Sequence, residues 1–106
     1  MSKLKINRFY YNPLPENLFI DHSKIHGHGI FAKANIKINT DLGCTHIKVP
    51  MVFGYIRTPL GGFVNHAKNN NCELHLVEDW DDYLIYNIFT VRKILKGEEI
   101  LLNYDK

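Results

Sequence analysis

Three short segments of this 106-residue chain hold the residues whose types and spacing could do chemistry. In the first, Gly27 and Gly29 stand two apart, and a backbone without Cβ atoms can approach a ligand closely and offer its own amides and carbonyls. In the second, Asn65 precedes His66, and an asparagine amide both donates and accepts hydrogen bonds, which suits an amino-acid head group or an adenine edge. In the third, residues 97–104, a Gly-Glu-Glu turn leads through an apolar run to a tyrosine. Each segment by itself is more typical of an ordinary turn or strand.

Short strands must position these segments. Runs of β-favouring residues bounded by turn residues predict strands over 18–20, 30–32, 42–52, 72–77, 83–91 and 99–104. Residues 58–62 and 69–71 are predicted to be loops, and the acidic run 78–82 is predicted to be the tip of a hairpin. The chain has no long stripe of 3.6-residue period, so the pattern indicates a mostly-β domain.

Length and composition limit the function classes. A chain of this length forms one small domain, and its 45% hydrophobic and 12% aromatic content is typical of a folded protein. The net charge is only +2 and the lysines are scattered, which argues against direct nucleic-acid binding. Cys44 and Cys72 form no CxxC pair and are interpreted as buried thiols. With no signal-peptide pattern and no apolar run of about 20 residues, we expect a soluble intracellular protein, cytoplasmic or, if viral, nuclear in a host.

In this order and at this spacing, the three segments resemble the motifs of SET-domain protein lysine methyltransferases, over nearly the whole chain. The first family motif is Gly-x-Gly followed by an apolar-aromatic-Ala run, and it is matched by Gly27, Gly29 and residues 30–32. The second family motif contains an Asn-His pair after a short apolar stretch and closes with an asparagine a few residues later. It is matched by residues 63–66 and Asn71. The third is Gly-Glu-Glu, an apolar residue and a later tyrosine, and it is matched by residues 97–100 and Tyr104. The strand residues 88–94 are also similar.

The resemblance implies a fold and a cofactor. The expected fold is a β-clip-like arrangement of several small sheets, with a C-terminal pseudoknot that brings the second and third motifs together. It implies that S-adenosylmethionine is the cofactor, held by His26, Gly27, His28, Gly29, Asn65 and His66. It also places Tyr104 at the catalytic centre, as a hydroxyl that orients the substrate amine rather than as a general base.

The implied reaction transfers a methyl group from S-adenosylmethionine to a lysine amine of a protein, with histones among the candidate substrates. Leu74 and Leu102 match family positions that line the lysine channel, which would make that channel aliphatic. The alternative is a catalytically weak SET-like module that binds S-adenosylmethionine or a peptide without efficient turnover. Methylation of a non-histone or non-protein amine is a third reading.

Several positions depart from the family pattern. The serine and cysteine that usually follow Asn-His are Ala67 and Lys68, the usual proline is Asn70, and the aspartate before the tyrosine is Asn103. We expect these changes to alter the shape of the loop before they affect cofactor binding.

The expected domain organisation is minimal. Residues 1–16 are expected to form an N-terminal lead and residues 17–106 a SET domain without zinc modules before or after it. Because the segment between the first and second motifs is short, a homodimer could supply the missing wall of the peptide groove. The pair His26 and His28 with His66 or His75 lacks the ligand set of a zinc site, so no metal is expected.

Overall fold

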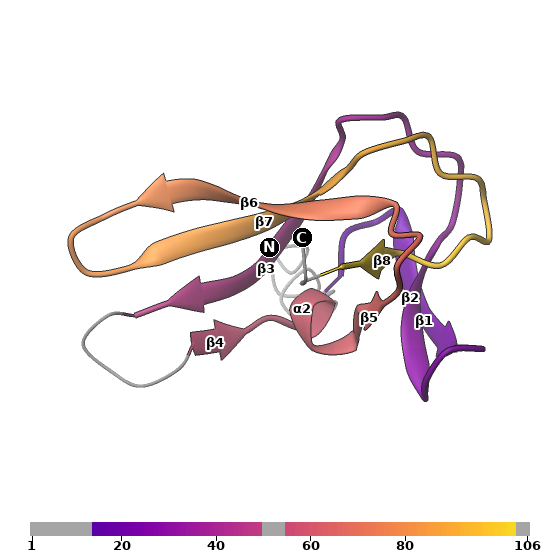
Figure 1. The fold of residues 1–106 in the computed structure, drawn as a ribbon, viewed down its shortest axis with the longest axis horizontal. Coiled ribbons are helices and arrows are strands. Elements are labelled where there is room, and N and C mark those ends of the chain that lie inside the picture. Colours follow the sequence, from indigo (N-terminus) through magenta and orange to yellow (C-terminus); the bar gives the residue numbers. More distant parts are fainter. Residues whose placement is uncertain (1–13, 50–54, 104–106) are drawn as a thin grey trace, which may run out of the picture.

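The computed structural model describes residues 14–49 and 55–103, and most of this part is built from short strands in three sheets (Figure 1). The predicted mostly-β class and the arrangement in several small sheets are confirmed. Most of the expected N-terminal lead and Tyr104 lie outside the described residues. The described part contains no helix with the length and apolar character that crossing a membrane requires.

The largest sheet has four strands in the order β4-β3-β7-β6. These strands are β3 Asp41–Lys48, β4 Tyr55–Arg57, β6 Cys72–Asp79 and β7 Leu84–Thr90, and all of the pairings are antiparallel. The predicted hairpin with its acidic tip joins β6 to β7. The far end of this sheet extends beyond the core (Figure 1), and Leu76 is exposed there.

Two irregularities in β3 shape the region beside it. The register between β3 and β7 shifts around Leu42 and again around Thr45, where one residue of β3 has no partner on β7. A β-bulge of this kind bends the strand and turns a carbonyl or side chain toward a new neighbour. The second bulge brings the buried Thr45 against the segment that follows β4.

That segment corrects one prediction. Residues 58–62 are predicted to be a loop, but the structure has a short helix, α2 Pro59–Phe63. Thr58 caps it by accepting a hydrogen bond from the Gly61 amide at 3.2 Å, and proline at the first helical position supplies a suitable φ. Thr58 also anchors the helix to β3, because its amide donates to the Thr45 carbonyl at 2.9 Å. Capping and tertiary anchoring therefore outweigh the low helix propensity of Gly61 and Gly62.

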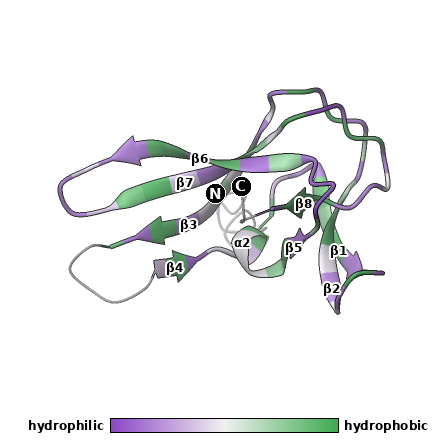
Figure 2. Ribbon diagram, in the orientation of Figure 1, coloured by the Kyte–Doolittle hydropathy of each residue, from purple (hydrophilic) through white to green (hydrophobic). Residues whose placement is uncertain are grey.

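The two remaining sheets contain residues of the three sequence motifs. Strand β1 Leu18–His22 pairs antiparallel with β2 His28–Ala32, which confirms the two predicted strands and the tight turn between them. Strand β5 Asn65–His66 pairs in parallel with β8 Leu101–Leu102. The last predicted strand, residues 99–104, is therefore represented by only two strand residues, 101 and 102. Figure 2 shows β8 as hydrophobic, which agrees with its burial in the core. This core is shared by all three sheets; its buried side chains include Leu18, Ile30, Leu42, Leu60, Ile88, Ile94, Ile100 and Leu102.

Candidate active site

The first motif forms a turn organised by Ser23. Its amide donates to the Gly27 carbonyl at 2.8 Å, and its hydroxyl oxygen accepts from the amides of Ile25 and His26. Gly27 has φ +46, in the left-handed region that favours glycine. A Cβ added to Gly27 would meet nothing within 4 Å, so open space lies beside the turn.

Asn65 joins all three motifs. Its side-chain nitrogen lies 3.1 Å from the His26 carbonyl oxygen, 3.1 Å from the His28 carbonyl oxygen and 2.8 Å from Glu99 Oε2. The other carboxylate oxygen of Glu99 accepts the Ser23 hydroxyl at 2.9 Å. An amide nitrogen has two hydrogens, so three acceptors in reach form a compact, electron-rich cluster around one donor. We call Asn65, Glu99 and the two carbonyls the junction.

The second glycine of the first motif lies directly against the junction. A Cβ on Gly29 would overlap the Glu99 carboxylate and lie 3.1 Å from the Asn65 side-chain nitrogen. A side chain at position 29 would therefore displace the Glu99 carboxylate from its place beside Asn65.

Asn71 fixes the C-terminal segment from the opposite direction. The side chain is fully buried; its nitrogen donates to the Glu99 carbonyl at 2.7 Å and its oxygen accepts from the Leu101 amide at 2.8 Å. Its backbone amide donates to the Leu101 carbonyl and its carbonyl accepts from the Val91 amide. Together with the β5–β8 pairing, these bonds hold residues 99–102 against the loop after β5. The expected meeting of the second and third motifs in a pseudoknot is confirmed.

Some of the predicted cofactor residues lie at the junction, and the side chains of others lie elsewhere. Gly27, Gly29, Asn65 and the carbonyls of His26 and His28 lie at or beside the junction. His66 follows Asn65 on β5 and pairs with Leu102. The His28 ring lies on the outer hairpin, 4.8 Å from the His22 ring. Within residues 14–49 and 55–103, no three His, Cys, Asp or Glu side chains gather as a metal site would require.

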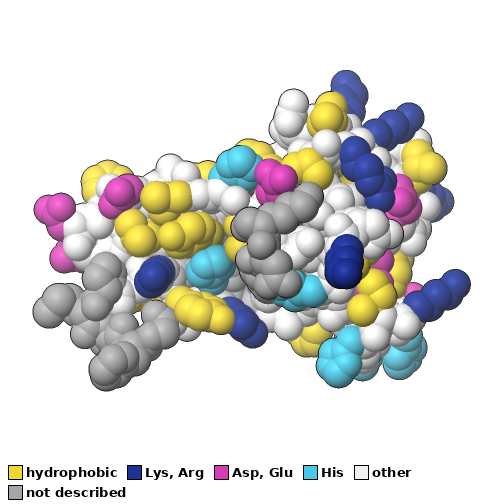
Figure 3. All heavy atoms as spheres, in the orientation of Figure 1, with side chains coloured by type: hydrophobic (Ala, Val, Ile, Leu, Met, Phe, Trp, Pro, Cys, Tyr) yellow, Lys and Arg dark blue, Asp and Glu magenta, His cyan; other side chains and the backbone are white. Residues whose placement is uncertain are grey.

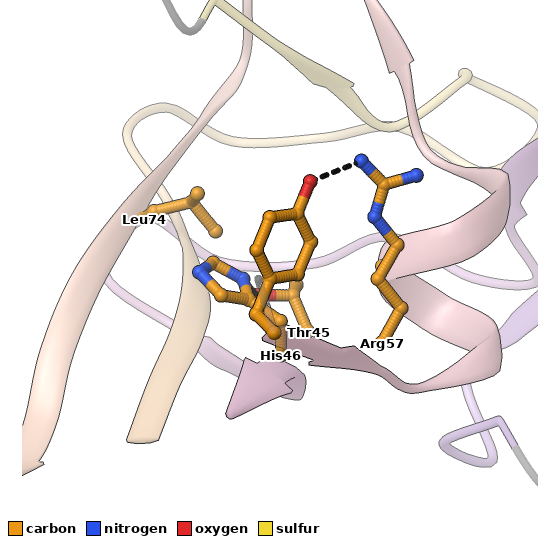
Figure 4. Close-up of a pocket in the computed structure, with 6 residues that line it drawn as sticks. Thr45, His46, Arg57 and Leu74 are labelled. Atoms are coloured by element: carbon orange, nitrogen blue, oxygen red, sulfur yellow. Dashed lines mark hydrogen bonds between the residues drawn. The ribbon is translucent and has the colours of Figure 1, made fainter. Parts of the chain in front are cut away.

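A cavity of about 310 Å³ opens on the other side of α2, between β3, β4 and β6 (Figure 4). Figure 4 shows Leu74 and Arg57 on opposite sides of this cavity, with His46 and Thr45 at its base. Leu74, predicted to line the lysine channel, does line this cavity. Leu102 instead packs in the buried core, against which Leu74 also packs. Their role toward a substrate stays a prediction.

Sequence reasoning gave no individual role to Glu99 or Asn71, and of the cavity residues it found only Leu74. Glu99 could have been singled out because an acidic residue next to a turn is a ready partner for an asparagine amide. Nothing in the sequence marks Thr45, His46 or Arg57, because a bulge and a strand pairing bring them together.

Comparison with known proteins bears on this geometry. A family model described as the SET domain matches residues 53–105, half of the chain. The chain belongs to the SET domain family. Within it, two curated relatives are histone-lysine N-methyltransferases, H3 lysine-36 specific, from two strains of Cryptococcus neoformans var. neoformans serotype D. Each is 46% identical over 48 residues, which is 43% of this chain and only 5% of the relative.

Solved structures support the same fold for this SET domain. A Plasmodium falciparum protein described as a candidate histone methyltransferase matches with a TM-score of 0.68 at 17% identity, covering 86% of this chain and 95% of that one. The structure of apo ctPRC2 with a mutated Ezh2 matches with a TM-score of 0.65 at 16% identity, covering 82% of this chain and 15% of that one. At these identities the likeness shows the fold alone.

Proposed function

We propose that this SET domain is an S-adenosylmethionine-dependent protein lysine methyltransferase. The observation that carries the proposal is the junction, where one asparagine amide ties together three sequence motifs of the family. Curated relatives that match 43% of the chain are named histone-lysine methyltransferases, which makes a basic protein such as a histone the first substrate to test.

The residues at the junction fit such a cofactor. Two backbone carbonyls and a carboxylate lie around Asn65, and this set of acceptors favours a positively charged group such as an ammonium or a sulfonium. A carbonyl oxygen has two lone pairs, so the His26 and His28 carbonyls retain acceptor capacity while they bind Asn65. The open space beside Gly27 leaves room for a ligand against the turn. His26 to Gly29, Asn65 and His66 are the residues proposed to hold it.

When bound, S-adenosylmethionine supplies an electrophilic methyl group, which a neutral amine displaces in line from sulfur. The protein has to align the amine, and alignment can contribute several kcal/mol to lowering such a barrier. We assign that alignment to the Tyr104 hydroxyl, which follows β8 by two residues in the sequence. The amine proton can leave to water, so no general base among the side chains is needed.

The substrate amine must be uncharged to react. A free lysine has a pKa near ~10.4, so the site has to lower it, and both an apolar channel and nearby positive charge act in that direction. Leu74, on the cavity wall and against the core, is proposed to line the path of the lysine stem. Leu102 is proposed to contribute from the buried side.

Cofactor binding is tested by calorimetry with S-adenosylmethionine and S-adenosylhomocysteine. Asn65→Ala is expected to weaken binding at least tenfold, because it releases both carbonyls and the Glu99 carboxylate. Asn69→Ala, at an exposed position of the next loop, is the matched control and should bind like the wild type. No binding of either compound at millimolar concentration would refute the cofactor assignment.

Turnover is tested by radiolabelled methyl transfer to histones and to a cell lysate, with Tyr104→Phe beside the wild type. We expect transfer by the wild type and at least a hundredfold loss in the variant, with cofactor affinity retained. Undiminished transfer by Tyr104→Phe would remove that residue from the mechanism. Cofactor binding without transfer to any protein would favour the binding module instead.

The homodimer expected from the sequence stays a prediction. Size-exclusion chromatography with light scattering measures it directly. A monomer mass throughout the working concentration range would contradict it.

A further inference from the structure

The cavity between β3, β4 and β6 is positively charged. Its lining consists of Thr45, His46, Tyr55, Arg57, Gly61 and Leu74. Among the described residues, this lining includes one permanent cation and no carboxylate. Figure 3 shows basic and histidine side chains among the hydrophobic ones over this half of the molecule, with acidic side chains at its far end and another beside a histidine near the middle. A carboxylate or phosphate group would therefore meet favourable charge at the cavity, and an ammonium group would not.

Arg57 is held in place by Tyr55, with no acidic partner in the described part of the chain. Its Nη2 atom donates to the Tyr55 hydroxyl at 2.6 Å, and its guanidinium carbon lies 5.1 Å from the centre of the Tyr55 ring. Among the described residues, no Asp or Glu oxygen lies within 4.0 Å of Arg57, and its other donors have no protein acceptor. A guanidinium has five donors in a fork that matches the two oxygens of a carboxylate. The remaining donors are thus available to a ligand.

His46 adds to this environment as a neutral ring. It stacks on Tyr86 at 4.6 Å and lies 5.2 Å from the Tyr55 ring. Burial lowers the pKa of His46, and the positive charges of Arg57 and Lys48 lower it further. The same two cations that disfavour a charged imidazole favour an anion.

We propose that this cavity binds an anionic group of the substrate, so that the preferred target lysine has an acidic residue within a few positions of it in the chain. The proposal rests on the methyltransferase function proposed above and names its substrate class. Leu74 connects the two sites: it lines the cavity and packs against the core that contains Leu102. An acidic side chain bound at Arg57 and a lysine stem passing Leu74 could then belong to one peptide.

The test compares peptides that differ in one residue near a single lysine. Glutamate, phosphoserine, glutamine or lysine is placed in turn at each position from three before to three after the target. We expect kcat/KM for the best glutamate peptide to exceed that of its glutamine counterpart about tenfold, and the lysine version to be the poorest. A phosphoserine peptide that is better still would indicate that the cavity prefers phosphate.

Variants of Arg57 test whether this residue causes the preference for acidic peptides. Arg57→Gln should abolish the preference and Arg57→Glu should reverse it in favour of the lysine peptide. Lys93→Gln removes an exposed charge that does not line the cavity and should keep the preference. Circular dichroism and melting curves check that each variant folds, and Arg57→Gln serves if Arg57→Glu does not fold.

Binding of the same peptides, labelled for fluorescence anisotropy, separates the two proposals. Equal kcat/KM values for the glutamate and glutamine peptides in wild type and Arg57→Glu would overturn the inference and leave the methyltransferase function intact. If no peptide is methylated, tighter binding of acidic peptides that Arg57→Glu removes would still support the anionic site while the function fails. Equal binding in that case would overturn both.

Discussion

The contact between α2 and β3 allows a sharp test of the fold around the cavity. An alanine Cβ at Gly61 would lie 2.8 Å from the Thr45 carbonyl carbon and closer still to its oxygen, whereas ordinary contact begins at 3.4 Å. Because the obstacle is backbone, the helix must retreat by roughly half an ångström or more. The neighbouring Gly62 is the matched control, because an added Cβ there would meet nothing within 4 Å.

The magnitude follows from what the retreat disturbs. The Thr58 amide bond to the Thr45 carbonyl (2.9 Å) and the Thr58 hydroxyl bond to the Cys44 carbonyl (2.6 Å) both span this contact. Each hydrogen bond contributes about 1 kcal/mol net, and overpacking a tight site costs about 1–3 kcal/mol. Alanine favours a helix over glycine by up to about 1 kcal/mol, which offsets part of this. Gly61→Ala should therefore lose about 2–4 kcal/mol and Gly62→Ala should gain about 0.5 kcal/mol.

Urea and thermal unfolding followed by circular dichroism measure both variants. A loss of about 2 kcal/mol, the lower end of this range, lowers the midpoint of a domain of this size by about 10 °C. If Gly61→Ala melts together with Gly62→Ala, the close approach of α2 to the Thr45 bulge is not rigid and the reasoning fails.

Three further predictions concern buried and titrating groups. Asn71→Ala should destabilise the fold by about 2–4 kcal/mol in urea unfolding, since it leaves two buried backbone groups unpaired, while Asn69→Ala should change it little; equal stabilities would contradict the role of Asn71 in the pseudoknot. Burial raises the pKa of the Cys72 thiol to about 12, so at pH 8 it should react with a thiol reagent only as fast as the protein unfolds, and rapid labelling of Cys72 would be inconsistent with that burial. Because the pKa of His46 is lowered in the folded protein, the unfolded chain binds a proton on His46 at a higher pH than the folded protein does. Stability should therefore fall as the pH drops below about 6.5. His46→Gln should flatten that part of a stability–pH curve, and an unchanged slope would argue against the lowered value.

Local patterns predicted most of the strands because each is short, rich in β-branched and aromatic residues, and bounded by turn residues. They failed at residues 58–62, where two glycines suggested a loop. The helix forms there because Thr58 and Pro59 fit its first turn and because the Thr45 carbonyl receives the Thr58 amide. The second of these causes lies in a distant strand, where single-residue propensities give no signal.

The candidate site also contains residues that the sequence predicts and residues that it does not. The motif residues Gly29 and Asn65 could be selected from the sequence, and the structure adds what lies between them, which is the Glu99 carboxylate. The cavity could not be predicted, because Thr45 and His46 reach it through a bulge and Arg57 through pairing with β3. Asn71 lies in a predicted loop, yet its burial depends on a strand that follows some 30 residues later.

The parallel pairing of β5 with β8 also sets an order of assembly. Every bond that holds residues 99–102 in place reaches back to segments made much earlier, whereas the four-stranded sheet needs only residues up to 90. That sheet can therefore form while Asn65 still lacks the Glu99 carboxylate and Asn71 still lacks its strand. Contacts so distant in sequence form slowly, so we expect the capacity to bind a ligand at the junction to appear last, in one late step.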